Sequence, residues 1–475
     1  MNRAEYERKR REYLAKKRRN RKIQVILRWV VLILVLVALG TWIVSTLGKN
    51  KQTPAGTEQT TSRPVTVPGA TNTPIPDATS TPTPAPTSTP TPTPNFVSMI
   101  AVGDNLYDWD MLEDGDSRKG KVGDGQFDFS GWYDNIAPYV KMADFAVINQ
   151  ETPLGGDNGY QSSGKELEFI GQKNRWGAYH GYATFNTPYE VADEFIKAGF
   201  NVVTSATNHT SDYGYTAIQK TLEYWKQHPE ITVLGIHDSE ESRNNITVLQ
   251  KNGIKIAVLN YTEFLNITTA IKDAPYSVDM LDTKRVKSDV EKAKQIADFV
   301  VVFPHWGKEY SLSIVDVQKE WTKRFAEYGV DAVIGAHPHI GEPMEMVTRP
   351  DGVVMPVYYS LGNFISIFKN ADCELGGMAY LEFVKDGDRK YIRESTVIPL
   401  VNHYNYDKNR FRSRCNFTVY ALQDYTEELE KEHGCLKFED GRKFSKKRME
   451  DLAKQLWGDN IKVVDWNNIY GVSSR

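Results

Sequence analysis

Two histidines one residue apart, His337 and His339, stand at the end of an apolar run and could together hold a metal ion. The run, Val330–Ile334, is rich in β-branched residues and is typical of a buried strand. Pro338 stiffens the turn between the two imidazoles. A His-x-His pair alone is a weak signal, because paired histidines also occur in surface loops. The ends of the other apolar runs therefore decide whether a metal site is present.

Metal-ligand residues also follow four other apolar runs. They are Asp104 after the first run, Glu151 after the second, Asn208 and His209 after the third, and His305 after a later one. Such oxygen and imidazole ligands suit divalent ions of the Mn, Fe, Zn or Mg type. Each residue has a plainer alternative: a turn for Asp104 or Asn208, and core packing for His209 or His305. The coincidence of all five runs favours one common site for one or two ions.

Hydrolysis is the chemistry that these residue types could perform. A metal ion lowers the pKa of a bound water towards neutrality and makes it a usable nucleophile. His209 could donate a proton to the leaving oxygen, with Asp212 orienting its ring. Glu309 could hold the ring of His305 or contact the substrate, and a salt bridge to a neighbouring side chain is an equal alternative. Asn363 is a candidate substrate contact in the wall of the site.

Alternating strand and helix patterns over residues 96–401 must position these side chains. The predicted strands are Phe96–Val102, Asp144–Ile148, Asn201–Ser205, Ile231–Leu234, Ile254–Asn260, Phe299–Phe303, Ala332–Gly335, Val353–Tyr359 and Met378–Val384. The predicted helices are Trp132–Met142, Pro188–Ala198, Tyr215–Gln227, Thr283–Ile296 and Val317–Tyr328, with stops at Gly199 and Gly329. This alternation predicts a largely parallel or mixed sheet covered by helices, with functional residues beyond the carboxyl ends of the strands.

Six motifs, in order along the chain, resemble the poly-γ-glutamate capsule biosynthesis (CapA) family. They are Gly103-Asp104, Asn149-Gln-Glu151, Asn208-His209-x-x-Asp212-Tyr-Gly214, His305-Trp-Gly-x-Glu309-Tyr310, Gly335-Ala-His-Pro-His339 and Tyr359-Ser-Leu-Gly-Asn-Phe364. That family is similar to the calcineurin-like metallophosphoesterases. The resemblance therefore implies an α/β fold, a four-layer α/β/β/α sandwich over residues 96–401. It also implies a function in the synthesis of capsule or another cell-envelope polymer.

The resemblance also implies a role for each matching residue. A first metal would be held by residues that match Asp104 and His339, and a second by those that match Asn208, His305 and His337. Glu151 resembles the carboxylate that bridges the two metals. His209 resembles the histidine that protonates the leaving group. The phosphoesterase pattern has a further histidine ligand two residues after its first aspartate, where this chain has Leu106. The first metal site is therefore expected to be the weaker one.

The first 95 residues are predicted to anchor the protein to a membrane. Residues 1–23 are dense in lysine and arginine, and residues 24–48 contain an apolar run long enough to cross a bilayer. No good cleavage site follows, so the run is predicted to be an uncleaved signal-anchor with its basic tail in the cytoplasm. The Thr/Pro-rich residues 49–95 indicate a disordered, extended linker. A single-pass protein of a Gram-positive bacterium, with an extracellular C-terminal domain, fits this pattern.

Net charge, cysteine content and the C-terminal residues indicate possible partners and disulfide bonds. The formal net charge of −3 gives no indication of nucleic-acid binding, and 40% hydrophobic residues suit a packed core. Cys373, Cys415 and Cys435 are too few for a disulfide framework, but one bridge could form outside the cell, with Cys415–Cys435 favoured. Residues 402–475 are polar and aromatic, and are expected to form a C-terminal extension on or beside the core.

Two functions of different classes fit the sequence. One is a membrane-anchored, outward-facing metallophosphoesterase-like hydrolase, acting on an anionic polymer or phosphoester of the capsule or envelope. The other is a non-catalytic component of a poly-γ-glutamate synthesis and export complex, which binds metal or nascent polymer beside other subunits. The set of metal ligands favours the first function, and Leu106 favours the second.

Overall fold

A computed structural model describes residues 95–465, except 121, 122, 125, 157–160, 163–164, 167–178, 180 and 183. The predicted cytoplasmic tail, signal-anchor helix and almost all of the linker lie outside the described residues. Within the described part of the chain, none of the helices combines the length and the apolar character needed to span a bilayer.

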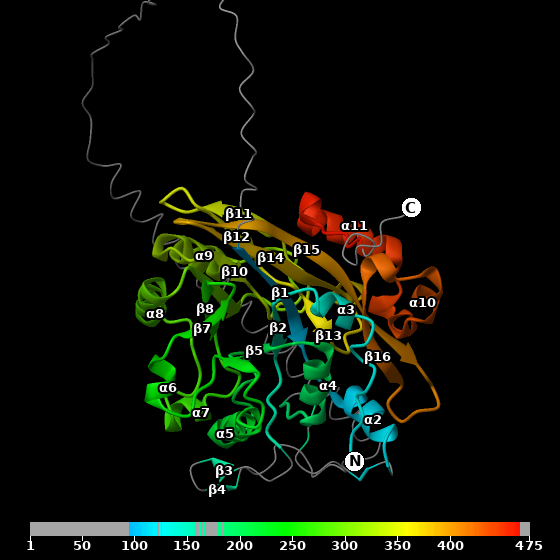
Figure 1. Ribbon diagram of the computed structural model, residues 1–475. Helices are drawn as coiled ribbons and strands as arrows, with labels where there is room; N and C mark the ends of the chain where they lie inside the picture. The colour runs from blue at the N-terminus through cyan, green and yellow to red at the C-terminus, as the bar shows by residue number, and fades with distance from the viewer. Residues whose placement is uncertain are drawn as a thin grey trace, which may run out of the picture. The chain divides into compact units, whose positions relative to one another are not determined.

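Two mixed β-sheets form the centre of the fold (Figure 1). The first sheet has the order β16 (Arg414–Ala421), β15 (Arg389–Tyr406), β14 (Leu375–Asp386), β1 (Asn95–Asn105), β2 (Phe145–Gln150), β5 (Val202–Thr204) and β6 (Thr232–Leu234), with β13 (Asn363–Ile365) paired to the end of β1. The second has the order β11 (Met344–Thr348), β12 (Val354–Tyr358), β10 (Ala332–Ile334), β9 (Phe299–His305), β8 (Ile254–Thr262) and β7 (Thr247–Lys251). A separate hairpin joins β3 (Gln161–Ser162) and β4 (Lys165–Glu166).

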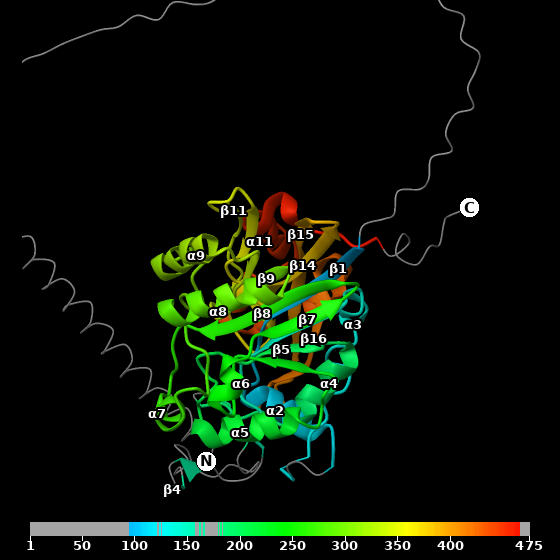
Figure 2. The same cartoon turned by 60° about the vertical axis from the view of Figure 1, so that its left-hand side comes forward.

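Helices lie around the two sheets (Figure 1). They are α2 (Trp109–Ser117), α3 (Ala137–Val140), α4 (Glu190–Ala198), α5 (Gly214–Trp225), α6 (Glu240–Asn244), α7 (Thr269–Asp273), α8 (Thr283–Ile296), α9 (Asp316–Tyr328), α10 (Glu427–Glu432) and α11 (Lys446–Trp457). Figure 2 shows α8 and α9 on one side of the molecule and α3 and α4 on the other. Gly199 and Gly329 end α4 and α9 with φ values of 118° and 89°, a conformation that favours glycine.

The alternation of side chains along β8 explains the layers. Ala257 and Leu259 pack with the residues of α8 and α9, whereas Ile256 and Val258 belong to the larger core that both sheets share. Aromatic contact between the sheets continues this core, with ring centroids of Phe299 in β9 and Phe383 in β14 5.1 Å apart. The result is a mixed α/β fold in which two facing sheets lie between helices.

Every strand predicted from the sequence is present, and one predicted helix is largely wrong. Of Trp132–Met142, only Ala137–Val140 is α-helical, and turns precede it. Pro138 explains the difference, because proline is tolerated in the first turn of a helix but removes a hydrogen bond from its interior. Sequence patterns missed the helices α2, α6 and α7 and the strands β3, β4, β7, β11, β13, β15 and β16.

The described part of the C-terminal extension continues the first sheet. β15 runs through the predicted domain boundary at residue 401, and β16 pairs antiparallel with it. Cys373, Cys415 and Cys435 are all buried and free, so the favoured Cys415–Cys435 bridge was wrong. Cys415 lies in β16 opposite Asn405, while the Cys435 thiol faces the carbonyl oxygen of Gly441.

Candidate metal centre

The carboxyl ends of parallel strands from both sheets meet at one site. At this site lie Asp104 at the end of β1, Glu151 after β2, Asn208 and His209 after β5, His305 at the end of β9, and His337 and His339 after β10. All of these side chains are buried. The structure thus brings together the strand ends that the sequence singled out.

Two groups of three side chains are arranged to hold a metal ion. The Asp104 group consists of Asp104, Glu151 and His339, and the His305 group consists of Glu151, His305 and His337. In each group one ligand atom from every residue lies within 4.8 Å of the other two. Glu151 belongs to both groups, which is the arrangement required for one carboxylate to bridge two ions.

Unpaired buried atoms at this site fit a bound cation. Within the described part of the chain, the two carboxylate oxygens of Glu151 and Nδ1 of His337 have no hydrogen-bond partner. A buried polar group left without a hydrogen bond costs about 1–3 kcal/mol. A divalent cation would remove that cost, and the mixed oxygen and imidazole donors suit Mn, Fe, Zn or Mg ions.

Both histidines of the His-Pro-His turn have a strained backbone that surrounding contacts hold in place. His337 has a φ of 101° and His339 a φ of 58°, in the left-handed region that non-glycine residues rarely adopt. Such conformations cost about 1–3 kcal/mol each and persist only where surrounding contacts enforce them. Here the backbone N–H of His337 donates to Oδ1 of Asp104 at 3.1 Å, and that of Tyr310 donates to the Pro338 carbonyl at 2.8 Å.

Charge and burial set the protonation of the imidazoles. Burial, reinforced by neighbouring histidines, lowers the pKa of His305 well below its usual range and that of His337 to about 3. For His339 burial acts in the same direction, but the carboxylates of Glu151 and Asp104 outweigh it and raise the pKa to about 9. Burial also raises the pKa of Glu151. His305 and His337 are therefore neutral, as metal ligands must be.

His209 and Asp212 form a hydrogen-bonded pair beside the two groups. Nδ1 of His209 lies 2.7 Å from Oδ2 of Asp212, which also accepts the backbone N–H of Phe185 at 2.8 Å. The ring of Phe185 packs edge-on against His209, with centroids 4.6 Å apart. The side-chain amide of Asn266, which sequence analysis did not single out, lies 3.4 Å from both ring nitrogens. These contacts fix the ring of His209.

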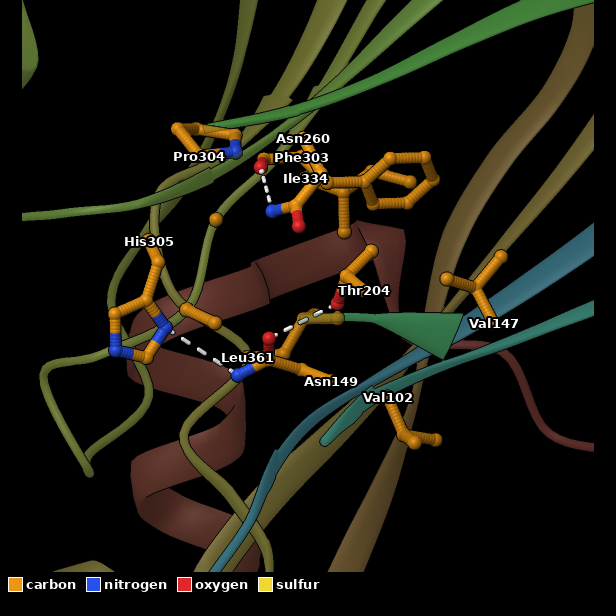
Figure 3. Close-up of a pocket in the computed structure, with 12 residues that line it drawn as sticks. Val102, Val147, Asn149, Thr204, Asn260, Phe303, Pro304, His305, Ile334 and Leu361 are labelled. Atoms are coloured by element: carbon orange, nitrogen blue, oxygen red, sulfur yellow. Dashed lines mark hydrogen bonds between the residues drawn. The ribbon is translucent and has the colours of Figure 1, made fainter. Parts of the chain in front are cut away.

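Asn149 connects one ligand of each group, and sequence analysis gave it no role. Its amide donates to Oδ1 of Asp104 at 2.8 Å and lies 3.3 Å from Nδ1 of His305. The Thr204 hydroxyl in turn donates to the Asn149 side-chain oxygen at 2.9 Å. Asn149, Thr204 and His305 line the small pocket drawn in Figure 3. Only the strand register of the folded protein assigns this role, because Asn149 pairs with Asp104 across β1 and β2.

The other predicted site residues lie in different surroundings. Nε2 of His305 lies 2.9 Å from Oδ1 of Asn208, and its Nδ1 faces the amide of Asn149. Both ring nitrogens therefore face amides, and the suggestion that Glu309 holds this ring was wrong. Glu309 is exposed, but its charge contributes to the raised pKa of Glu151. Asn363 is buried in β13, and Leu106 is buried in the core.

A further buried carboxyl group, Glu342, lies three residues beyond His339. Its Oε2 accepts a hydrogen bond from Nε2 of Gln318 at 2.6 Å, and burial raises its pKa to about 8. The unfolded chain releases this proton at a pKa of about 4.3, whereas the folded chain retains it up to about pH 8. The free energy of unfolding should therefore fall as the pH rises across this interval, because the folded state resists ionisation.

The Glu342→Gln variant should lose this pH dependence. Its free energy of unfolding should exceed that of the unmodified protein by on the order of 2 kcal/mol at pH 8 and should match it near pH 4.5. Urea denaturation at the two pH values measures the difference. Glu327→Gln, at an exposed carboxylate of α9, is the control and should change neither value. An unaltered pH dependence in Glu342→Gln would contradict the assignment.

Comparison with known proteins places this site in a family. The family described as "Bacterial capsule synthesis protein PGA_cap" matches residues 98–367, which include every residue of both metal-ligand groups. The PGA biosynthesis protein CapA of Bacillus subtilis is 30% identical over 231 residues, 48% of this chain and 55% of that protein. The capsule biosynthesis protein CapA of Bacillus anthracis is 27% identical over 237 residues, 49% and 52% of the two chains. The chain thus spans about half the length of these relatives.

Solved structures share less with this chain. A calcineurin-like phosphoesterase from Bacillus subtilis has 13% identity and a TM-score of 0.36, covering 65% of this chain and 91% of its own. A 5'-nucleotidase from Candida albicans has 12% identity and a TM-score of 0.36, covering 77% and 59%. Scores this low establish neither fold nor activity. The family match covers more than half of the chain and confirms the family resemblance: the protein belongs to the PGA_cap family of bacterial capsule synthesis proteins.

Proposed function

We propose that the protein is a metal-dependent, phosphoesterase-like hydrolase that acts on an anionic polymer or phosphoester during capsule or cell-envelope synthesis. The observation that carries this proposal is the sharing of Glu151 between two ligand groups. The family supports the capsule context. Its Bacillus subtilis relative is described as a PGA biosynthesis protein, and we take poly-γ-glutamate as the polymer. Other subunits of a synthesis complex are expected partners.

Each residue of the site would have a distinct task. The Asp104 group would hold one ion, and the His305 group together with Asn208 would hold the other. When bound, divalent cations supply positive charge that activates water and neutralises a phosphate group. His209 would donate a proton from Nε2 to the leaving oxygen, because its Nδ1 is bonded to Asp212. Phe185 would exclude water from one side of that ring.

Hydrolysis should therefore depend on divalent metal. With Mn²⁺ the purified full chain should cleave bis(p-nitrophenyl) phosphate, and a chelator should abolish turnover until Mn²⁺ is restored. Release of p-nitrophenol measures the rate, and metal analysis of the same sample counts the ions. Bound ions without turnover, in Mn²⁺, Fe²⁺, Zn²⁺ and Mg²⁺ alike, would instead support a non-catalytic component that binds metal or polymer.

We also propose that residues 24–48 anchor the protein in the cell membrane, with the globular part outside. The basic residues 1–23 and the apolar run that follows support this orientation. A protease added to intact cells, after digestion of the cell wall, should cut within residues 49–95 and release the globular part. An antibody to the C-terminal part detects the product, and a cytoplasmic protein should remain intact. Protection of the globular part in such cells would refute the orientation.

A further inference from the structure

The replacement of a histidine by Leu106 leaves the Asp104 group with three protein ligands. We propose that the side-chain oxygen of Asn363 is the fourth ligand of this group. This inference rests on the metal centre of the proposed function and deepens it, but it does not require that the centre be catalytic. It follows from the pairing of β13 with β1, the orientation of one amide, and two distances.

Close backbone approach places Asn363 beside Asp104. The two residues are direct partners in the parallel pairing of β1 and β13, and the N–H of Asp104 donates to the Gly362 carbonyl at 2.9 Å. A Cβ atom on Gly103 would lie 1.9 Å from that same oxygen. Only glycine at position 103 therefore allows β13 to lie so near.

Hydrogen bonds orient the Asn363 amide. Its nitrogen donates to the carbonyl oxygens of His339 at 2.9 Å and Cys373 at 3.0 Å. Exchange of the amide nitrogen and oxygen would place an oxygen against two carbonyl oxygens, so the network admits one orientation. The amide oxygen is consequently the atom that faces Nδ1 of His339, at 3.2 Å. The side chain is buried, with 1% of the residue exposed.

The spacing of these atoms fits coordination to one ion. Nδ1 of His339 lies 3.0 Å from Oδ2 of Asp104 and 3.2 Å from Oδ1 of Asn363. Two ligands at about 2.1 Å from an octahedral ion, at right angles to each other, are about 3.0 Å apart. Asn363 thus stands where a neighbouring ligand of the same ion would stand.

An amide oxygen would replace an imidazole with a donor of equal charge and greater hardness. Both groups are neutral, so the Asp104 group carries the same charge that it would carry with a histidine. Oxygen donors favour Mn²⁺ and Mg²⁺, whereas imidazole also suits Zn²⁺. The substitution therefore moves the preference of this group towards the harder ions.

Metal binding to the full chain tests the proposal without reference to turnover. Equilibrium dialysis with Mn²⁺ should find two ions in the unmodified protein, and Asn363→Ala should weaken only one of them, by at least about 10-fold. Asn208→Ala is the matched control and should weaken the ion of the His305 group. Unchanged affinity in Asn363→Ala, or the absence of an ion that depends on Asp104, would overturn the proposal.

The number of water molecules bound to the ion distinguishes a metal ligand from a residue that merely orients His339. Line broadening of the Mn²⁺ electron paramagnetic resonance signal in ¹⁷O-labelled water should reveal one additional bound water in Asn363→Ala. An unchanged number of waters would show a positioning role only and would overturn the proposal.

Should Asn363→Ala fail to fold, Asn208→Ala labelled with ¹³C in its asparagine amides provides the test. Electron–nuclear double resonance of bound Mn²⁺ should still detect a coupled amide carbon, because Asn363 remains. The absence of coupling would exclude Asn363 as a ligand.

Discussion

In the Glu151→Ala variant, both divalent ions should be lost together. Glu151 is the residue that the Asp104 group and the His305 group share, so its removal takes a ligand from each. A catalytic metal centre would supply several kcal/mol of transition-state stabilisation, so under the proposed function hydrolysis should fall by at least about 10³-fold. Metal analysis after dialysis, together with the rate of phosphodiester cleavage, measures both effects.

Folding of this variant should be intact. Both carboxylate oxygens of Glu151 lack a hydrogen-bond partner within the described structure, and burial raises the pKa of this carboxyl group. Without metal, Glu151→Ala should thus be at least as stable as the unmodified protein in thermal unfolding. Glu342→Gln is the matched control, because Glu342 is a buried carboxyl group outside both ligand groups and its variant should retain two ions. Loss of only one ion in Glu151→Ala would contradict the bridging role.

The His209→Ala variant should retain both ions but lose most of its activity. Nδ1 of His209 is bonded to Asp212, so in the proposed function Nε2 would protonate the leaving oxygen. Removal of a general acid typically lowers kcat by about 10²–10⁴-fold. The loss should be smaller with p-nitrophenolate, which leaves readily without a proton, than with an alkoxide. Comparison of kcat for aryl and alkyl phosphodiesters measures this difference.

A second histidine–carboxylate pair provides the control for this experiment. Nε2 of His237 lies 2.9 Å from Oδ2 of Asp279, and neither residue belongs to a metal-ligand group. His237→Ala should therefore leave kcat and metal content unchanged. An equal loss of activity for aryl and alkyl substrates in His209→Ala would argue against proton donation, and loss of metal would assign His209 a structural role at the centre.

Local patterns in the sequence predicted the positions of the principal candidate ligands. β-Branched runs mark buried strands, and Asp104, Glu151, His305 and His337 could be recognised because each lies within three residues of the end of such a run. The order of strands and helices likewise predicted a mixed α/β fold. This information is local, since it depends on burial and on residues adjacent in the chain.

The tertiary structure decided which residues meet. Glu151 lies in both ligand groups because the ends of β1, β2, β9 and β10 converge from two sheets, which no local pattern encodes. Asn363 lies beside Asp104 through a strand pairing that spans more than 250 residues of sequence. The long-range pairing of β14 with β1 likewise brings β15 and β16 into the first sheet. Periodicity reports that a strand is buried, but register and partner depend on the packing of the whole core.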